Sequence, residues 1–162
     1  MPPRRSALAR RATALAAAAG VLLAAGCGTN QNDEAPAACL VGNEAYLRAL
    51  DSAPGQVRLD GNTPISDCLV PEQDAGQLAN IGHEMIIAAT KLNAEARRDP
   101  SGPATVQLGY LIGAVARGAD SIHTDLVRRL NSAARFSQAG GIVSARFERV
   151  FGRGYAAGHA SG

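Results

Sequence analysis

The chain has 162 residues and a formal net charge of +2 at pH 7, with 46% hydrophobic and 4% aromatic residues. This length suits a single domain with an ordinary hydrophobic core. Because no clearly basic domain stands out, we expect no nucleic-acid partner. The scarcity of aromatic residues leaves few surfaces on which sugars or bases could stack.

Residues 1–26 have the layout of a secretory signal peptide. An arginine-rich start containing Arg10 and Arg11 precedes an uncharged, mostly apolar run over residues 12–25. This run of 14 residues is shorter than the roughly 20 that a membrane-spanning helix needs. Ala25 and Gly26 are small residues of the kind found at a cleavage site. The Arg10–Arg11 pair leaves twin-arginine export open as an alternative route.

A cysteine directly follows this cleavage site. Residues 23–27 read Leu-Ala-Ala-Gly-Cys, which resembles the lipobox of bacterial lipoproteins. The resemblance, confined to residues 1–27, implies that the Cys27 thiol receives a diacylglycerol and that Cys27 becomes the first residue after cleavage. It also implies export and anchoring to a lipid bilayer through acylated Cys27, on the extracytoplasmic face of the cell envelope. The alternative is an ordinary signal peptide followed by a coincidental cysteine.

Removal of residues 1–26 reverses the sign of the charge. The remaining chain has 12 basic and 14 acidic residues, a formal charge of −2. Residues 27–100 contain 5 basic and 11 acidic residues, whereas residues 101–162 contain 7 basic and 3 acidic ones. The two parts of the mature chain are therefore oppositely charged.

Two further cysteines, Cys39 and Cys68, remain if Cys27 carries lipid. In an oxidising compartment such a pair is expected to form a disulfide. A loop of about 30 residues closed in this way stabilises the fold by roughly 3–4 kcal/mol. The alternative is two free buried thiols. Metal binding has less support because no cysteine or histidine lies close to either one.

The first part of the mature chain is a spacer followed by a short helix and turns. Residues 27–38 comprise the lipidated cysteine and a polar, flexible spacer, and the domain occupies residues 39–162. Asn43 can cap a short helix that stops before Pro54. Residues 56–68 contain turn signals and a brief alternation of apolar residues, which predicts a turn-rich, two-stranded segment.

A long helix is predicted over residues 71–98. Pro71 suits a first helical position, and Asp74 with Gln77 resembles a capping box. Apolar residues then recur at spacings of three and four along one face: Leu78, Ile81, Met85, Ala89, Leu92 and Ala96.

The next segment, residues 104–116, is apolar nearly all round, as is typical of a helix buried at the centre of a bundle. Gly109 and Gly113 would let a neighbouring helix approach closely. Gly118 is expected to end this helix, and another is expected to begin at Asp120 or Ser121. One unbroken helix to residue 136 is the alternative.

The last helix is predicted over residues 142–155, and the glycine-containing tail over residues 152–162 is expected to fray. The resulting fold class is all-α: a single bundle of about four main helices with a disulfide-stapled, turn-rich N-terminal segment.

The sequence offers no recognisable catalytic set, so we expect a non-enzymatic protein with no cofactor and no metal site. His83 and Glu84 begin like a zinc-protease helix, but the required second histidine is replaced by Ile87. His123 falls within an apolar stripe, where it needs a hydrogen-bond partner. A metal- or haem-associated bundle using His123 or His83, with Met85, stays an alternative, as does a hydrolase of unrecognised type.

The last helix carries the only pattern that points to a partner. Three arginines, Arg146, Arg149 and Arg153, gather within about 60° on one face, opposite an apolar face that includes Val143 and Phe147. The simple interpretation is a docked amphipathic helix with a solvated face. The more specific interpretation is an arginine stripe that faces an anionic partner, either anionic lipid or wall polymer. The leading functional hypothesis is therefore a lipid-anchored binding or envelope-associated module.

Overall fold

The computed structural model describes residues 34–135 and 144–162. Cys27, the predicted signal peptide, almost all of the predicted spacer and Val143 lie outside these residues. The described chain is helical and contains no strand, which confirms the all-α class. Its main elements are α1 (Asn43–Leu50), α2 (Ala75–Arg98), α3 (Pro103–Gly118), α4 (Thr124–Ala133) and α5 (Ala145–Ser161), and its 3-10 turns are η1 (Ala37–Leu40), η2 (Ile65–Cys68) and η3 (Ser121–His123).

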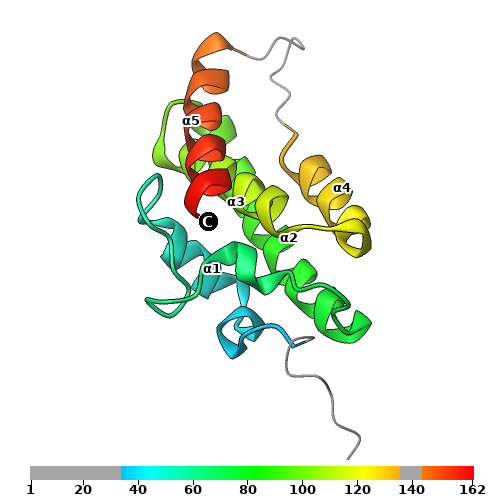
Figure 1. Cartoon of the computed structure of the whole chain (residues 1–162). Helices are drawn as coiled ribbons and strands as arrows, with labels where there is room; N and C mark the ends of the chain where they lie inside the picture. Colours follow the sequence, from blue (N-terminus) through cyan, green and yellow to red (C-terminus); the bar gives the residue numbers. More distant parts are fainter. Residues whose placement is uncertain (1–33, 136–143) are drawn as a thin grey trace, which may run out of the picture.

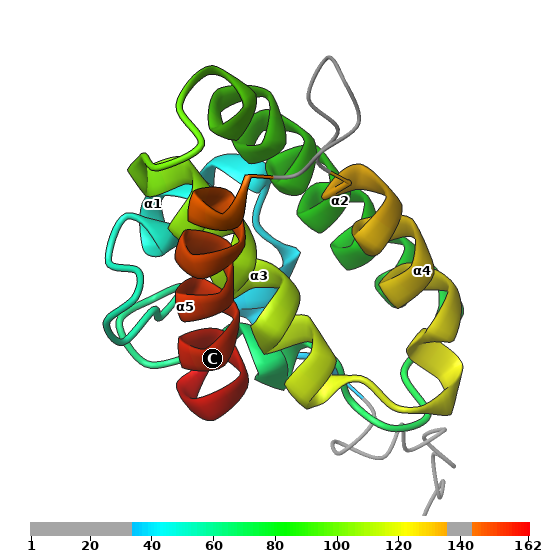
Figure 2. The same ribbon diagram turned by 90° about the horizontal axis from the view of Figure 1, so that it is seen from above.

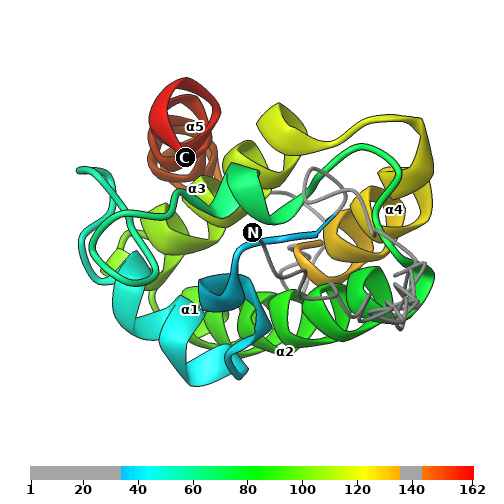
Figure 3. The same ribbon diagram turned by 60° about the horizontal axis from the view of Figure 1, so that its bottom comes forward.

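Helix α3 occupies the middle of the molecule. Figures 2 and 3 show α5 packed along one side of α3 and α2 along the other, with α4 beside α2. The prediction that α3 is buried almost all round is confirmed, since Leu108, Tyr110 and Leu111 are fully buried. Helix α3 ends at Gly118, and α4 follows as a separate helix. The alternative of one unbroken helix is therefore wrong.

Helix α2 begins at Ala75 rather than at Pro71. Asp74 is the N-cap, and its carboxylate accepts hydrogen bonds from the backbone N–H groups of Gly76 and Gln77 at 2.9 and 3.0 Å. The Gln77 side chain does not complete the predicted capping box. Instead its Oε1 accepts the backbone N–H of Ala35 at 2.8 Å. This hydrogen bond attaches the first residues of the described chain to the start of α2.

The segment before α2 contains turns and η2 but no strand, so the predicted two-stranded element is wrong. Its turn at Asp60 is present: Asp60 Oδ1 accepts the N–H groups of Asn62 and Thr63, and Gly61 adopts a φ of 85°. The hydrogen bond from Thr63 is the largest cause that lowers the pKa of Asp60, and the one from Asn62 is the next. Both act by stabilising the charged form of the carboxyl group. The turn satisfies the local backbone without a partner strand.

The Cys39–Cys68 disulfide is formed, as predicted, and both cysteines are completely buried. The Tyr46 hydroxyl lies beside it and donates to the Cys39 carbonyl oxygen at 2.8 Å. Burial is the main cause that raises the pKa of Tyr46 well above its usual range, and the negative charge of Glu84 raises it further. The disulfide thus joins the start of the described chain to η2 in the core.

Glycines allow the backbones of α3 and α5 to touch. A Cβ atom on Gly109 or Gly113 would lie 2.2 Å from a carbonyl oxygen of α5. A Cβ atom on Gly154 or Gly158 would lie 2.0 or 2.1 Å from a carbonyl oxygen of α3. The close approach predicted from the first pair is confirmed, and it depends on glycines in both helices.

The predicted frayed tail is wrong, because α5 continues to Ser161. Side chains from other elements bind the carbonyl oxygens at its end. Arg117 donates to His159 and Ala160, Arg58 donates to Ser161 at 2.9 Å, and the Ser66 hydroxyl donates to Gly162. Cationic groups at a helix C-terminus also complement the helix dipole. Tertiary contacts therefore outweigh the low helix propensity of the glycines.

Candidate functional site

The candidate site is the outward face of α5. Ser144 caps the helix, with its hydroxyl accepting the Phe147 N–H at 3.2 Å. The Phe147 side chain is 6% exposed and packs with Ala96 of α2 and Phe151. Together with the glycine contacts, this packing fixes which side of α5 faces solvent.

Arg146, Arg149 and Arg153 are all exposed on that outward side. No ion pair involving these three arginines is found among the described residues. Their guanidinium groups are therefore open to an external anion, and a guanidinium can bind a phosphate or carboxylate through two parallel hydrogen bonds. Whether they bind one stays a prediction.

Additional arginines lie at the end of the molecule where α5 begins. Helix α2 finishes there with Arg97 and Arg98, both exposed. Helix α4 also finishes there, because Asn93 Nδ2 and Arg97 of α2 donate to the Arg135 carbonyl oxygen, each at 3.1 Å. Helix periodicity relates residues within one helix and not between helices, so the sequence pattern did not connect these arginines with the stripe.

The two candidate histidine ligands differ in environment. His83 is exposed on α2. His123 is completely buried, and its Nδ1 accepts the Asp120 N–H at 3.1 Å. Its Nε2 lies 3.3 Å from Gln73 Oε1, and its Nδ1 also lies 2.8 Å from the Asp120 carboxylate. Both ring nitrogens are engaged in structural hydrogen bonds, as expected for a core histidine.

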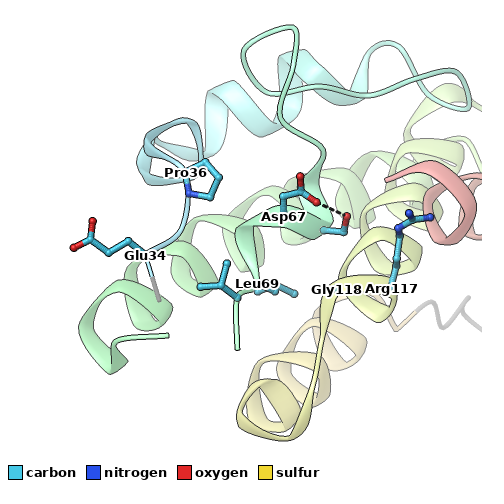
Figure 4. Close-up of a pocket in the computed structure, with 8 residues that line it drawn as sticks. Glu34, Pro36, Asp67, Leu69, Arg117 and Gly118 are labelled. Atoms are coloured by element: carbon cyan, nitrogen blue, oxygen red, sulfur yellow. Dashed lines mark hydrogen bonds between the residues drawn. The ribbon is translucent and has the colours of Figure 1, made fainter. Parts of the chain in front are cut away.

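A shallow pocket of about 520 Å³ lies between the start of the described chain, η2 and the end of α3 (Figure 4). Its charged lining residues are Glu34, Asp67 and Arg117. Arg117 is engaged by the carbonyl oxygens at the end of α5. The remaining charge of the pocket is acidic, so it is no second site for an anion.

Residues 34–135 and 144–162 contain neither a cluster of metal-binding side chains nor a helix suited to cross a membrane. No group of three or more His, Cys, Asp or Glu residues in this part of the chain is arranged to hold a metal ion. No helix in this part has both the length and the apolar character that crossing a bilayer requires.

The described site thus consists of an exposed arginine face on a helix fixed by backbone contact with α3.

Comparisons of the chain with protein-family models, with curated proteins and with solved structures found no significant match.

Proposed function

We propose that this chain is an exported, lipid-anchored binding module that acts without catalysis. Cys27 would carry the lipid, and the helical domain would present the arginine face of α5. In this proposal the four longest helices, α2 to α5, act as a single bundle whose rigidity keeps that face fixed. The arginine face, rather than a histidine or a buried carboxylate, is the binding element.

The buried Cys39–Cys68 disulfide is the observation that carries the proposal. Stable disulfides are typical of proteins outside the reducing cytosol, which supports export. The pairing also leaves Cys27 as the remaining one of the three cysteines in the sequence. A cysteine directly after a signal-peptide-like segment is the nucleophile that lipid attachment requires.

Fractionation of cells that produce the full chain tests the anchor. Wild-type protein should incorporate a labelled fatty acid and sediment with membranes, because two or more acyl chains anchor stably. The Cys27→Ala variant should lose both the label and the membrane association. Cys39→Ser is the control, since it removes a cysteine outside the lipobox and should keep the label. A wild-type chain that never takes up label would refute the anchor.

The metal- or haem-associated bundle is less favoured because both nitrogens of His123 already have partners. Elemental analysis and an absorption spectrum of the purified mature chain would test it. Detection of a stoichiometric metal or of a haem absorption band would favour the metal- or haem-associated bundle over the present proposal.

A further inference from the structure

The arginine face belongs to a larger basic end of the molecule. We call this set the arginine end; its members come from the end of α2, the end of α4 and the first turns of α5. The exposed arginines are Arg97, Arg98, Arg135, Arg146, Arg149 and Arg153. Three acidic residues lie on the same segments, Glu95, Asp99 and Glu148, and Asp99 is partly engaged because its Oδ1 accepts the Ser101 N–H at 3.0 Å.

The described chain begins at the opposite end of the molecule. In Figure 1, the described chain and α2 both begin at the bottom of the molecule, whereas α5 begins at the top. Ala35 is hydrogen-bonded to Gln77, and Arg98 is 21 residues further along α2. At 1.5 Å per residue, this separation is about 32 Å.

The end that contains Glu34 is acidic. Glu34, Asp67, Glu72 and Asp74 are exposed there, and the nearby Arg117 is engaged by α5 carbonyl oxygens. An anionic bilayer repels such a surface and attracts the arginine end. The attraction between the bilayer and the arginine end decays over a Debye length of about 8 Å at physiological salt. This attraction is therefore weak across a distance of about 32 Å.

We infer that the arginine end binds an anionic polymer lying beyond the membrane that holds the tether, rather than the surface of that membrane. This inference rests on the proposed anchoring at Cys27. The polymer would carry phosphate or carboxylate groups at regular intervals. Along α5 the three arginines rise by roughly 4.5 and 6 Å, from Arg146 to Arg149 and from Arg149 to Arg153. A flexible polyanion that runs along the helix axis therefore contacts all three in sequence.

The test uses the mature chain, residues 27–162, with Cys27→Ala so that no lipid contributes to binding. Labelled inorganic polyphosphate and labelled polyglutamate supply the two oxyanion types, and binding is followed by fluorescence anisotropy. Vesicles with and without anionic lipid supply the membrane surface, and binding is followed by sedimentation. All measurements are repeated over a range of salt concentrations.

The variant under test combines Arg146→Gln, Arg149→Gln and Arg153→Gln. Its matched control combines Arg48→Gln, Arg128→Gln and Arg129→Gln, which removes the same charge from exposed positions on α1 and α4. Arg97 is left intact because it holds the end of α4. Circular dichroism of both variants checks that each is folded.

The expected result is that at least one polymer binds and that the α5 variant loses at least about tenfold in affinity while the control does not. The logarithmic salt dependence should also become shallower by about two, since each lost contact with a single-stranded polyanion contributes about 0.7. Polyphosphate binding without polyglutamate binding assigns the phosphate class, and the reverse assigns the carboxylate class.

Two results would overturn the inference: binding of neither polymer at low salt, or equal loss of binding in the test and control variants. Vesicle binding that matches polymer binding and depends on the same three arginines would make the bilayer the partner instead. None of these outcomes bears on lipid attachment. Failure of the anchor, seen by fractionation, is therefore distinguishable from failure of the arginine end.

Discussion

The α-carbon of Gly113 in α3 lies directly against the backbone of Tyr155 in α5: a methyl group on Gly113 would stand 2.2 Å from the Tyr155 carbonyl oxygen. The opposing atoms are backbone atoms, which cannot rotate away as a side chain can. A larger residue on either helix must therefore displace α5 as a whole. Because α5 carries the arginine face, this contact positions the candidate site.

Replacing Gly154 with alanine should be strongly destabilising. The new Cβ would lie 2.0 Å from the Val106 carbonyl oxygen, so the free energy of unfolding should fall by about 3 kcal/mol. Gly152→Ala is the matched control. It lies in the same helix with no atom within 4 Å of its Cβ, and it should gain about 0.5–1 kcal/mol from higher helix propensity. Urea unfolding measures both changes, and equal effects would contradict the backbone contact.

Loss of the disulfide should cost about 3–4 kcal/mol, because 29 positions separate the two cysteines and the closed loop restricts the unfolded chain. The double variant Cys39→Ser and Cys68→Ser gives this value by urea unfolding. The intact mass of the wild-type mature chain should be two hydrogens below the reduced mass. Since both sulfur-bearing residues are fully buried, alkylation of native protein under mild reductant should be slow. Rapid alkylation would contradict this burial.

His123→Ala should destabilise the fold by about 2–4 kcal/mol. The change leaves a cavity and removes the partners of the Asp120 N–H and of Gln73 Oε1. His83→Ala removes an exposed histidine and should change stability by less than about 0.5 kcal/mol. Urea unfolding of the two variants compares them directly. A small effect at His123 would show that its hydrogen bonds carry little of the stability.

Acid should remove a stabilising contribution made by Glu84. Both the side chain and the backbone N–H of Asn43 donate hydrogen bonds to Glu84 Oε2. These hydrogen bonds lower the pKa of the Glu84 carboxyl group, and the one from the side chain has the larger effect. A carboxyl group whose folded pKa is lowered stabilises the fold above its unfolded pKa. That contribution is lost as the pH falls below about 4.

The Glu84→Gln variant should therefore lose less stability than the wild type between neutral pH and pH about 3. Glu95→Gln is the control, because it removes a carboxylate from the same helix without touching the Asn43 contact. Unfolding followed across this pH range measures the difference. An unchanged acid dependence in Glu84→Gln would contradict the role of the hydrogen bonds.

Local patterns in the sequence predicted much of the fold. The apolar periodicity predicted α2, the nearly continuous apolar run predicted buried α3, and the even cysteine pair predicted the disulfide. The Asp74 cap was also predicted, but the start at Pro71 was wrong. Gln73 lies just before α2 and binds the Cys68 carbonyl oxygen and His123, and these distant partners leave no trace in local spacing.

The end of α5 shows why local reasoning failed. Glycines weaken an isolated helix, so four of them between residues 152 and 162 indicated fraying. In the fold, Gly154 and Gly158 instead permit backbone contact with α3. Arg58 and Arg117, distant in sequence, bind the terminal carbonyl oxygens. The orientation of the arginine stripe followed from periodicity, whereas its proximity to Arg98 and Arg135 required the packing of three helices.

The disulfide also determines how a mechanical load would travel through an anchored chain. A pull applied at Glu34 reaches Cys39 after five residues and passes through the sulfur bridge to Cys68. Residues 40–67, including α1, lie outside this covalent path and carry no tension while the bridge is intact. The force enters the folded body next to α2 and α3, its best-buried helices. Tension from a moving envelope would therefore not unravel the turn-rich segment first.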